Sequence, residues 1–147
     1  MKRVLGTSAA LAALLFGLSC ARSQEAAKSA APSPAASADV KVIEVTAKKY
    51  EYTPGEIHVK KGTRVQLKIH ALDHTHGFKI KLFPEGAPET GTPGLRFDPQ
   101  QDNFKIEKEQ DRVIEFVAER AGTYPFKCSV FCGMGHGGMK GKLVVEE

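Results

Sequence analysis

The chain has 147 residues, of which 41% are hydrophobic and 26% charged, a composition typical of a folded domain and not of a disordered chain. Its formal net charge of +4 at pH 7 is too small to indicate the basic stripe of a nucleic-acid-binding protein. One segment near the N-terminus approaches membrane-spanning character, and this pattern excludes a membrane protein with several spans.

The first twenty residues have the layout of an export signal. A Lys-Arg pair precedes an uncharged, largely apolar run over residues 4–18, which is short for a membrane span. The run ends in a Ser-Cys pair, and residues 16–20 resemble the lipobox of bacterial lipoproteins, except that Gly17 replaces the usual leucine. We therefore expect a signal peptide over residues 1–20 and a lipid on Cys20. Simple cleavage near this point and an uncleaved single anchor are the alternatives.

Residues 21–38 separate this signal from the rest of the chain. They are rich in alanine, serine and proline and contain no large apolar side chain. Such a segment buries too little surface to offset its ordering entropy, so we expect a flexible linker.

Lipidation, simple cleavage and an uncleaved anchor all lead to the same expected location. Each of them places the folded domain, residues 39–147, outside the cytoplasm, in the periplasm or at the outer face of a bacterial membrane.

From residue 40 onward the hydrophobic pattern has mostly a period of two, which is typical of half-buried strands. Glycine and proline punctuate the pattern, and no convincing helical period reaches ten residues beyond the linker. We expect an all-β sandwich or small barrel of about seven or eight strands. The expected strands cover residues 40–45, 56–60, 63–70, 77–83, 112–118, 123–128 and 139–146.

Residues 84–102 interrupt this regularity with four prolines and three glycines. A loop of this length is uncommon inside a compact domain and is often functional. A lid, a docking surface and a variable surface insertion are the three interpretations of this segment.

The residues that carry chemistry gather near the C-terminal end, where residues 128–139 read CSVFCGMGHGGM. The spacing Cys-x3-Cys-x3-His-x2-Met gives a soft ligand set, which selects copper over calcium or magnesium. A mononuclear blue-copper site uses one cysteine with two histidines and a weak axial methionine. The additional cysteine indicates a dinuclear centre, because two thiolates can each bridge two metal ions. A second histidine must come from elsewhere in the chain, and His74 and His76 are the candidates.

The twelve-residue motif resembles the metal loop of CuA domains, the cupredoxin-fold domains of cytochrome c oxidase subunit II and of nitrous oxide reductase. Residues 76–78 are similar to the segment with the family's first histidine, and residues 122–128 and 141–145 resemble the strands beside the loop. The resemblance covers residues 40–147 and implies a cupredoxin-like Greek-key β-sandwich with two copper ions. It implies the following ligands: bridging thiolates from Cys128 and Cys132, one imidazole each from His76 and His136, a weak axial thioether from Met139 and the backbone carbonyl of Val130.

The resemblance implies an exported one-electron carrier of a respiratory chain. Its partners would be a c-type cytochrome, a terminal oxidase or reductase, and the membrane through the lipid anchor; nucleic acid and small-molecule substrates are not expected. The chain would not be an enzyme by itself, although it could serve as subunit II of a cytochrome c oxidase. It contains no tryptophan, whereas the oxidase subunits commonly use an aromatic cluster near the metal for electron entry. We expect a free-standing protein, without the two-helix anchor of the oxidase subunit or the propeller domain of the reductase.

Other interpretations remain open. A copper chaperone would hold one Cu(I) and exchange it readily. A mononuclear cupredoxin would leave one cysteine outside the coordination sphere. The two cysteines would form a disulfide in a copper-free protein of an oxidising compartment. A zinc site is less favoured, because methionine is a poor zinc ligand.

Overall fold

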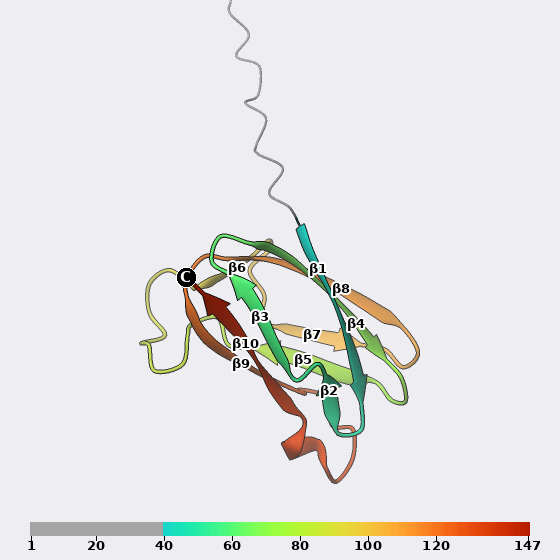
Figure 1. Ribbon diagram of the computed structural model, residues 1–147. Coiled ribbons are helices and arrows are strands. Elements are labelled where there is room, and N and C mark those ends of the chain that lie inside the picture. The colour runs from blue at the N-terminus through green and yellow to red at the C-terminus, as the bar shows by residue number, and fades with distance from the viewer. Residues whose placement is uncertain (1–39) are drawn as a thin grey trace, which may run out of the picture. The chain divides into compact units, whose positions relative to one another are not determined.

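The computed structural model describes residues 40–147, which form ten β-strands and one turn of 3-10 helix, η1 (Figure 1). The elements in chain order are β1 (Val40–Lys48), β2 (Glu51–Thr53), β3 (Glu56–Lys60), β4 (Arg64–Ala71), β5 (His76–Ile80), β6 (Leu95–Phe97), β7 (Asn103–Ile106), β8 (Asp111–Ala118), β9 (Gly122–Lys127), η1 (His136–Gly138) and β10 (Lys140–Glu146). Among these residues no helix has the length and hydropathy needed to cross a membrane.

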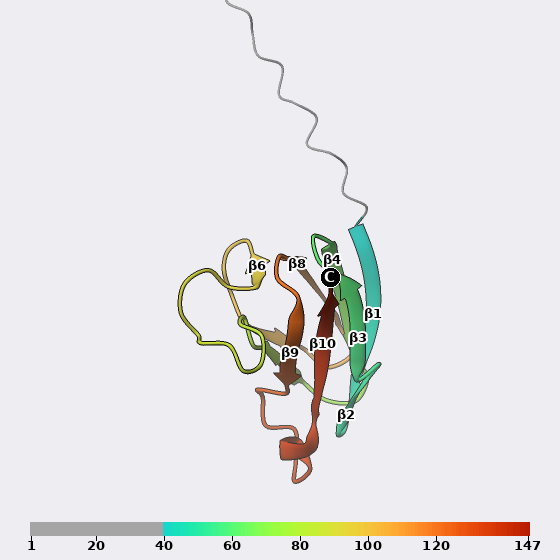
Figure 2. The same cartoon turned by 60° about the vertical axis from the view of Figure 1, so that its left-hand side comes forward.

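The strands form two sheets of five. Sheet A has the order β2-β1-β4-β8-β6, and sheet B has the order β3-β10-β9-β5-β7. Both sheets are mixed, because β1 pairs in parallel with β4 and β3 pairs in parallel with β10, while the other pairs are antiparallel. Figure 2 shows β9 and β10 of sheet B running side by side down to the loop that joins them.

The core follows from the alternation of side chains along the strands. In β4 every second residue is buried, and Val65, Leu67, Ile69 and Ala71 are each at most 1% exposed. Successive side chains of a strand point to opposite faces of the sheet, so this pattern sends one face of each strand inward. The buried side chains of both sheets belong to one hydrophobic cluster, which makes the fold a sandwich.

Three aromatic rings connect the two sheets next to the start of β5. Tyr52 of β2 meets Phe126 of β9 edge to face, with ring centroids 5.3 Å apart, and Phe78 of β5 at 5.9 Å. Such edge contacts are favourable for the aromatic quadrupoles. The Tyr52 hydroxyl also donates a hydrogen bond to the carbonyl of Gly77. This bond fixes the start of β5, where His76 stands.

The all-β sandwich expected from the sequence is confirmed, with ten strands in place of seven or eight. The three strands that the pattern did not reveal are β2, β6 and β7, of three or four residues each. Alternation needs more than two inward positions to be recognisable in a sequence. Residues 84–102 are not all loop, because Leu95 and Phe97 of β6 are buried and pair with β8. The predicted signal peptide, the lipidation of Cys20 and the linker lie outside the described residues.

Candidate metal centre

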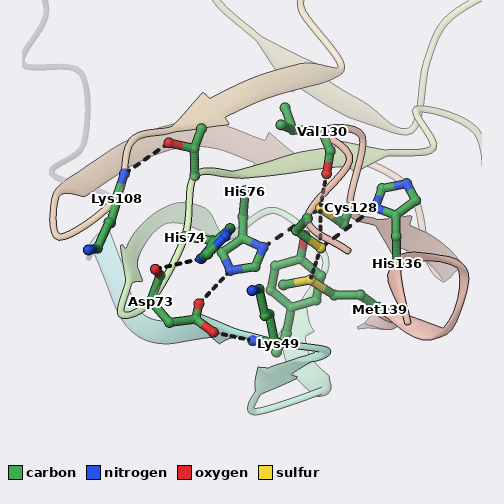
Figure 3. Close-up of polar contacts among 12 residues, drawn as sticks. Lys49, Asp73, His74, His76, Lys108, Cys128, Val130, His136 and Met139 are labelled. Carbon is green, nitrogen blue, oxygen red and sulfur yellow. Dashed lines mark hydrogen bonds and ion pairs between the residues drawn. The ribbon is translucent and has the colours of Figure 1, made fainter. Parts of the chain in front are cut away.

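Two segments that are far apart in the sequence meet at one end of the sandwich. This is the end opposite the C-terminus, where the loop between β9 and β10 projects (Figures 1 and 2). The first is the turn before β5, which ends at His76. The second is the loop of residues 128–139 between β9 and β10. The backbone N–H of Cys128 donates to the carbonyl of Met139 at 2.9 Å and closes this loop. Inside the loop, η1 turns the chain so that His136 faces back toward Cys132 (Figure 3).

The donor atoms of the two histidines and two cysteines form a continuous series. His76 Nδ1 lies 3.9 Å from Cys128 Sγ, and Cys128 Sγ lies 4.0 Å from Cys132 Sγ. Cys132 Sγ lies 3.7 Å from His136 Nδ1. Each sulfur therefore has an imidazole nitrogen within 4 Å, and the His76 donor atom lies within 4.8 Å of both sulfurs.

The two weak donors also lie at the centre. The thioether sulfur of Met139 is 3.9 Å from Cys132 Sγ, and the backbone carbonyl oxygen of Val130 is 3.1 Å from Cys128 Sγ. The structure thus brings together all six residues that the sequence indicated as ligands. His74, the alternative to His76, is exposed, and its Nδ1 donates to the backbone carbonyl of Asp73 at 2.7 Å. Since that nitrogen is engaged away from the sulfurs, His76 is the histidine at the centre.

The two cysteines are free thiols. Their sulfurs are 4.0 Å apart, about twice the length of a disulfide bond of about 2.05 Å. The separation is also less than two metal–thiolate bonds of about 2.3 Å each, so one ion can contact both sulfurs. The disulfide considered from the sequence is therefore not formed in this structure, and the spacing suits a shared metal.

Most of the centre is shielded from water. The exposed fraction is 0% for His76 and Met139, 3% for Cys128 and 2% for Cys132, whereas His136 is half-buried. Burial, together with the neighbouring Cys128, raises the pKa of the Cys132 thiol to about 11. Two buried thiolates side by side repel each other, so both become stable only when a cation lies between them.

Asp73 orients the imidazole of His76. The Nε2 atom of His76 lies 2.9 Å from Asp73 Oδ1, and Asp73 Oδ2 accepts the backbone N–H of Lys49 at 2.9 Å (Figure 3). Burial alone would raise the pKa of Asp73, but the hydrogen bonds from His76 and Lys49 hold that pKa below its ordinary value. The carboxylate accepts a hydrogen bond from Nε2–H, which keeps the ring proton on Nε2 and leaves the Nδ1 lone pair directed at the sulfurs, as is common for histidine ligands of metals.

Close packing on glycine positions holds the loop in place. A Cβ on Gly77 would lie 2.1 Å from Ser129 Oγ and 2.8 Å from the backbone nitrogen of Val130. The Gly77 N–H points at Cys128 Sγ at 3.4 Å. On the other side of the loop, the ring of Tyr50 occupies the space that a Cβ on Gly135 would need. Sequence reasoning did not find Tyr50 or Asp73, although Asp73 stands only three residues before His76.

Comparisons with known proteins place these observations in a family context. A family model described as a cupredoxin-like domain matches residues 8–145. Cytochrome c oxidase subunit 2 of Thermus thermophilus is 28% identical over 105 residues, which are 71% of this chain and 65% of that protein. A nitrous-oxide reductase of Ralstonia nicotianae is 27% identical over 109 residues, 71% of this chain but 14% of the reductase. The chain thus spans less than two thirds of these relatives.

A solved structure shows the same fold. It is that of auracyanin A, a blue copper protein of Chloroflexus aurantiacus, with a TM-score of 0.54 and 18% sequence identity. The match covers 73% of this chain and 99% of auracyanin A. Residues 40–147 therefore share their two-sheet fold with auracyanin A.

Proposed function

This chain belongs to the cupredoxin-like domain family, and from that premise we propose that it is an exported one-electron carrier with a dinuclear CuA-type copper centre. The observation that carries the proposal is the set of donors, in which two free thiols 4.0 Å apart each have an imidazole nitrogen within 4 Å. A single blue-copper ion needs only one thiolate. Two thiolates with one imidazole each give two equivalent half-sites.

The residues present fit copper in chemistry as well as in position. Cys128 and Cys132 would bridge the two ions, and His76 and His136 would each hold one of them. Met139 and the carbonyl of Val130 supply the weak donors that copper electron-transfer sites use in axial positions. When bound, the copper pair supplies one-electron redox chemistry. No aspartate or glutamate of the described residues lies with His76 and the two cysteines in the cluster of closely spaced ligand atoms, which disfavours a harder metal.

The protein's own contribution is to keep these donors in one arrangement. Asp73 holds the ring of His76, the Gly77 N–H points at Cys128 Sγ, and the loop backbone is closed at Met139. Because His76 and Met139 are fully buried, water is kept away from that side of the centre. A site whose ligands do not move when charge changes suits repeated gain and loss of one electron, since little reorganisation accompanies each transfer.

The relatives suggest the context of this transfer. The chain is similar to a subunit of cytochrome c oxidase and to part of a nitrous-oxide reductase. We propose that it passes electrons between a c-type cytochrome and a terminal oxidase or reductase, without catalysing a reaction itself. The proposed location is the periplasm or the outer face of a bacterial membrane, where a lipid on Cys20 and the linker of residues 21–38 would keep the domain near its partners.

A single-ion site is the second candidate, because the donors of His76, Cys128 and Cys132 all lie within 4.8 Å of one another and can hold one metal alone. The two candidates differ in the role of Cys132. In the dinuclear site, Cys132→Ser removes one bridging thiolate, and we expect bound copper to fall from two ions per chain to one, with a changed visible spectrum.

The test is copper quantitation and visible spectroscopy of both proteins after removal of unbound metal. Cys20→Ser is the matched control, because Cys20 lies outside the described domain and should leave both readouts unchanged. The dinuclear proposal would be contradicted if the wild-type protein and Cys132→Ser both held one copper per chain and had the same visible spectrum. Ready transfer of a single Cu(I) to a chelator would indicate a copper chaperone.

A further inference from the structure

The outer face of sheet B carries a ladder of lysines beside the metal centre. Lys79 of β5 lies directly opposite Lys127 of β9, and Lys127 lies directly opposite Lys140 of β10. All three side chains are exposed, while the residues next to them are buried, except Gly141, which has no side chain. In Figures 1 and 2 the β9 and β10 strands that carry Lys127 and Lys140 run to the metal loop.

A second row lies two residues away, on β9, on β10 and just beyond the end of β5, and therefore on the same face. Lys81 and Lys142 flank Pro125, since the Lys81 N–H donates to the Pro125 carbonyl at 2.9 Å and Lys142 pairs with Pro125 across β9 and β10. The lysine ladder is hereafter the set of Lys79, Lys81, Lys127, Lys140 and Lys142. A hollow of about 370 Å³ opens between the two rows, bordered by Lys79, Lys81, Lys127, Lys140 and Pro125.

The charges of the ladder are only partly compensated. Lys79 lies 3.5 Å from Asp102, Lys142 lies 3.1 Å from Glu56, and Lys81 pairs with Glu89. Within residues 40–147, neither Lys127 nor Lys140 makes an ion pair or a side-chain hydrogen bond. Like charges directly opposite each other on neighbouring strands destabilise a sheet. The middle of the ladder thus holds two adjacent ammonium groups that nothing in the described domain neutralises.

The position of this pair connects it to the centre. Lys127 directly precedes Cys128, and Lys140 directly follows Met139, at the point where the Cys128 N–H bonds to the Met139 carbonyl. We propose that the lysine ladder docks the acidic surface of a redox partner protein, with one partner side chain entering the hollow beside Pro125. This inference rests on the proposed function of electron transfer, because it assigns the face through which the centre is approached.

An acidic protein fits this face better than an anionic membrane does. The five lysines form two rows across neighbouring segments of sheet B, and the hollow between the rows has room for one projecting side chain. Complementary charge of this kind governs the rate and specificity of association more than it governs total affinity. A flat lipid surface would leave the hollow unused.

The test measures binding of the full chain, with and without copper, to two forms of one c-type cytochrome by titration calorimetry at low ionic strength. The cytochrome is used in its native basic form and after succinylation of its lysines, which makes its surface acidic. We expect the acidic form to bind and the basic form not to bind. K127E/K140E should weaken binding of the acidic form by about tenfold or more and reduce its dependence on salt.

The matched control is K60E/K61E, which makes the same change of charge at the far end of β3, beside Glu146 of β10. It should change affinity by less than about twofold. An equal loss in both variants, or no binding of the acidic cytochrome, would overturn the proposal. Binding to vesicles of anionic phospholipid that depends on Lys127 and Lys140, without binding of the acidic cytochrome, would also overturn it in favour of a membrane contact.

Amide NMR provides a second measurement of the contact if K127E/K140E does not fold. Chemical-shift changes of the wild-type chain on addition of the acidic cytochrome then locate the residues in contact. Shifts at residues 79, 127 and 140 support the ladder, and shifts confined to other strands contradict it. Because docking is also measured without copper, a failure of electron transfer and a failure of docking give different results.

Discussion

Gly77 is the residue at which the two halves of the metal centre touch. The backbone of the loop at Ser129 and Val130 lies so close to Gly77 that a Cβ there would meet the Val130 nitrogen at 2.8 Å and the Ser129 nitrogen at 2.9 Å. Backbone atoms cannot rotate aside as a flexible side chain can. The absence of a side chain at position 77 is therefore a condition for His76 and Cys128 to approach each other.

This gives a prediction for Gly77→Ala. The added methyl should push residues 129–130 away from β5, destabilise the domain by about 1–3 kcal/mol and reduce copper retention. Urea denaturation and copper quantitation measure the two effects. Gly137→Ala is the matched control, because no atom lies within 4 Å of a Cβ at that position. Equal stability and copper content in the two variants would show that the contact at Gly77 does not hold the loop.

The six residues of the candidate centre were accessible from the sequence because five of them lie within one twelve-residue motif. His76 stands 52 residues before Cys128 and was one of two candidate histidines, and only the similarity to a family segment favoured it over His74. The residues that orient and pack the site could not be predicted in the same way. Tyr50 packs on the loop, and the Lys49 N–H bonds Asp73, through contacts that exist only once β1, β5 and the loop have come together.

At the scale of elements, the pairing of β3 with β10 carries a pH-sensitive contact. His58 of β3 lies between two carboxylates, with Nδ1 2.9 Å from Glu146 and Nε2 2.9 Å from Glu56. These hydrogen bonds, with that from Glu146 the larger, raise the pKa of His58 above its ordinary value. A histidine whose pKa is raised on folding stabilises the folded state below its unfolded pKa, and this contribution is lost as the pH rises through the folded pKa.

His58→Gln should therefore lower the denaturant midpoint more at about pH 5.5 than at about pH 9, where the imidazole is neutral in both states. Urea unfolding of the copper-free protein at the two pH values checks this. His74→Gln serves as the control, because the ring of His74 contacts a backbone carbonyl and not a carboxylate. A difference between variant and parent that is the same at both pH values would rule out the proposed contact.

The strands that the sequence predicted well are those in which apolar and polar residues alternate over five residues or more. The bounds of β3 were predicted to the residue, and β4 was displaced by one residue at each end. The short strands were missed because a three-residue strand such as β6 has only two inward positions, here Leu95 and Phe97. Their strand character comes from pairing with β8, which a local pattern does not contain.

At the scale of the whole described domain, the sandwich supplies a rigid frame for the centre. Tyr52 from sheet A bonds to Gly77 of sheet B, and its ring packs on Phe78 and Phe126 directly below the site. Burial, with a further contribution from Cys128, raises the pKa of Tyr52, so its hydroxyl stays protonated as a donor. Both sheets thus fix the start of β5, so the fold itself holds the donor atom of His76 in place.

The central claim is that this frame holds two equivalent copper ions that share one electron. The most direct test is an electron paramagnetic resonance spectrum of the copper-loaded chain, recorded with copper quantitation on the same sample. Two equivalent copper nuclei sharing one unpaired electron predict a seven-line hyperfine pattern and two coppers per chain. A four-line pattern with one copper per chain would contradict the dinuclear centre and indicate a mononuclear carrier, and a single silent Cu(I) per chain would contradict electron transfer and indicate copper delivery.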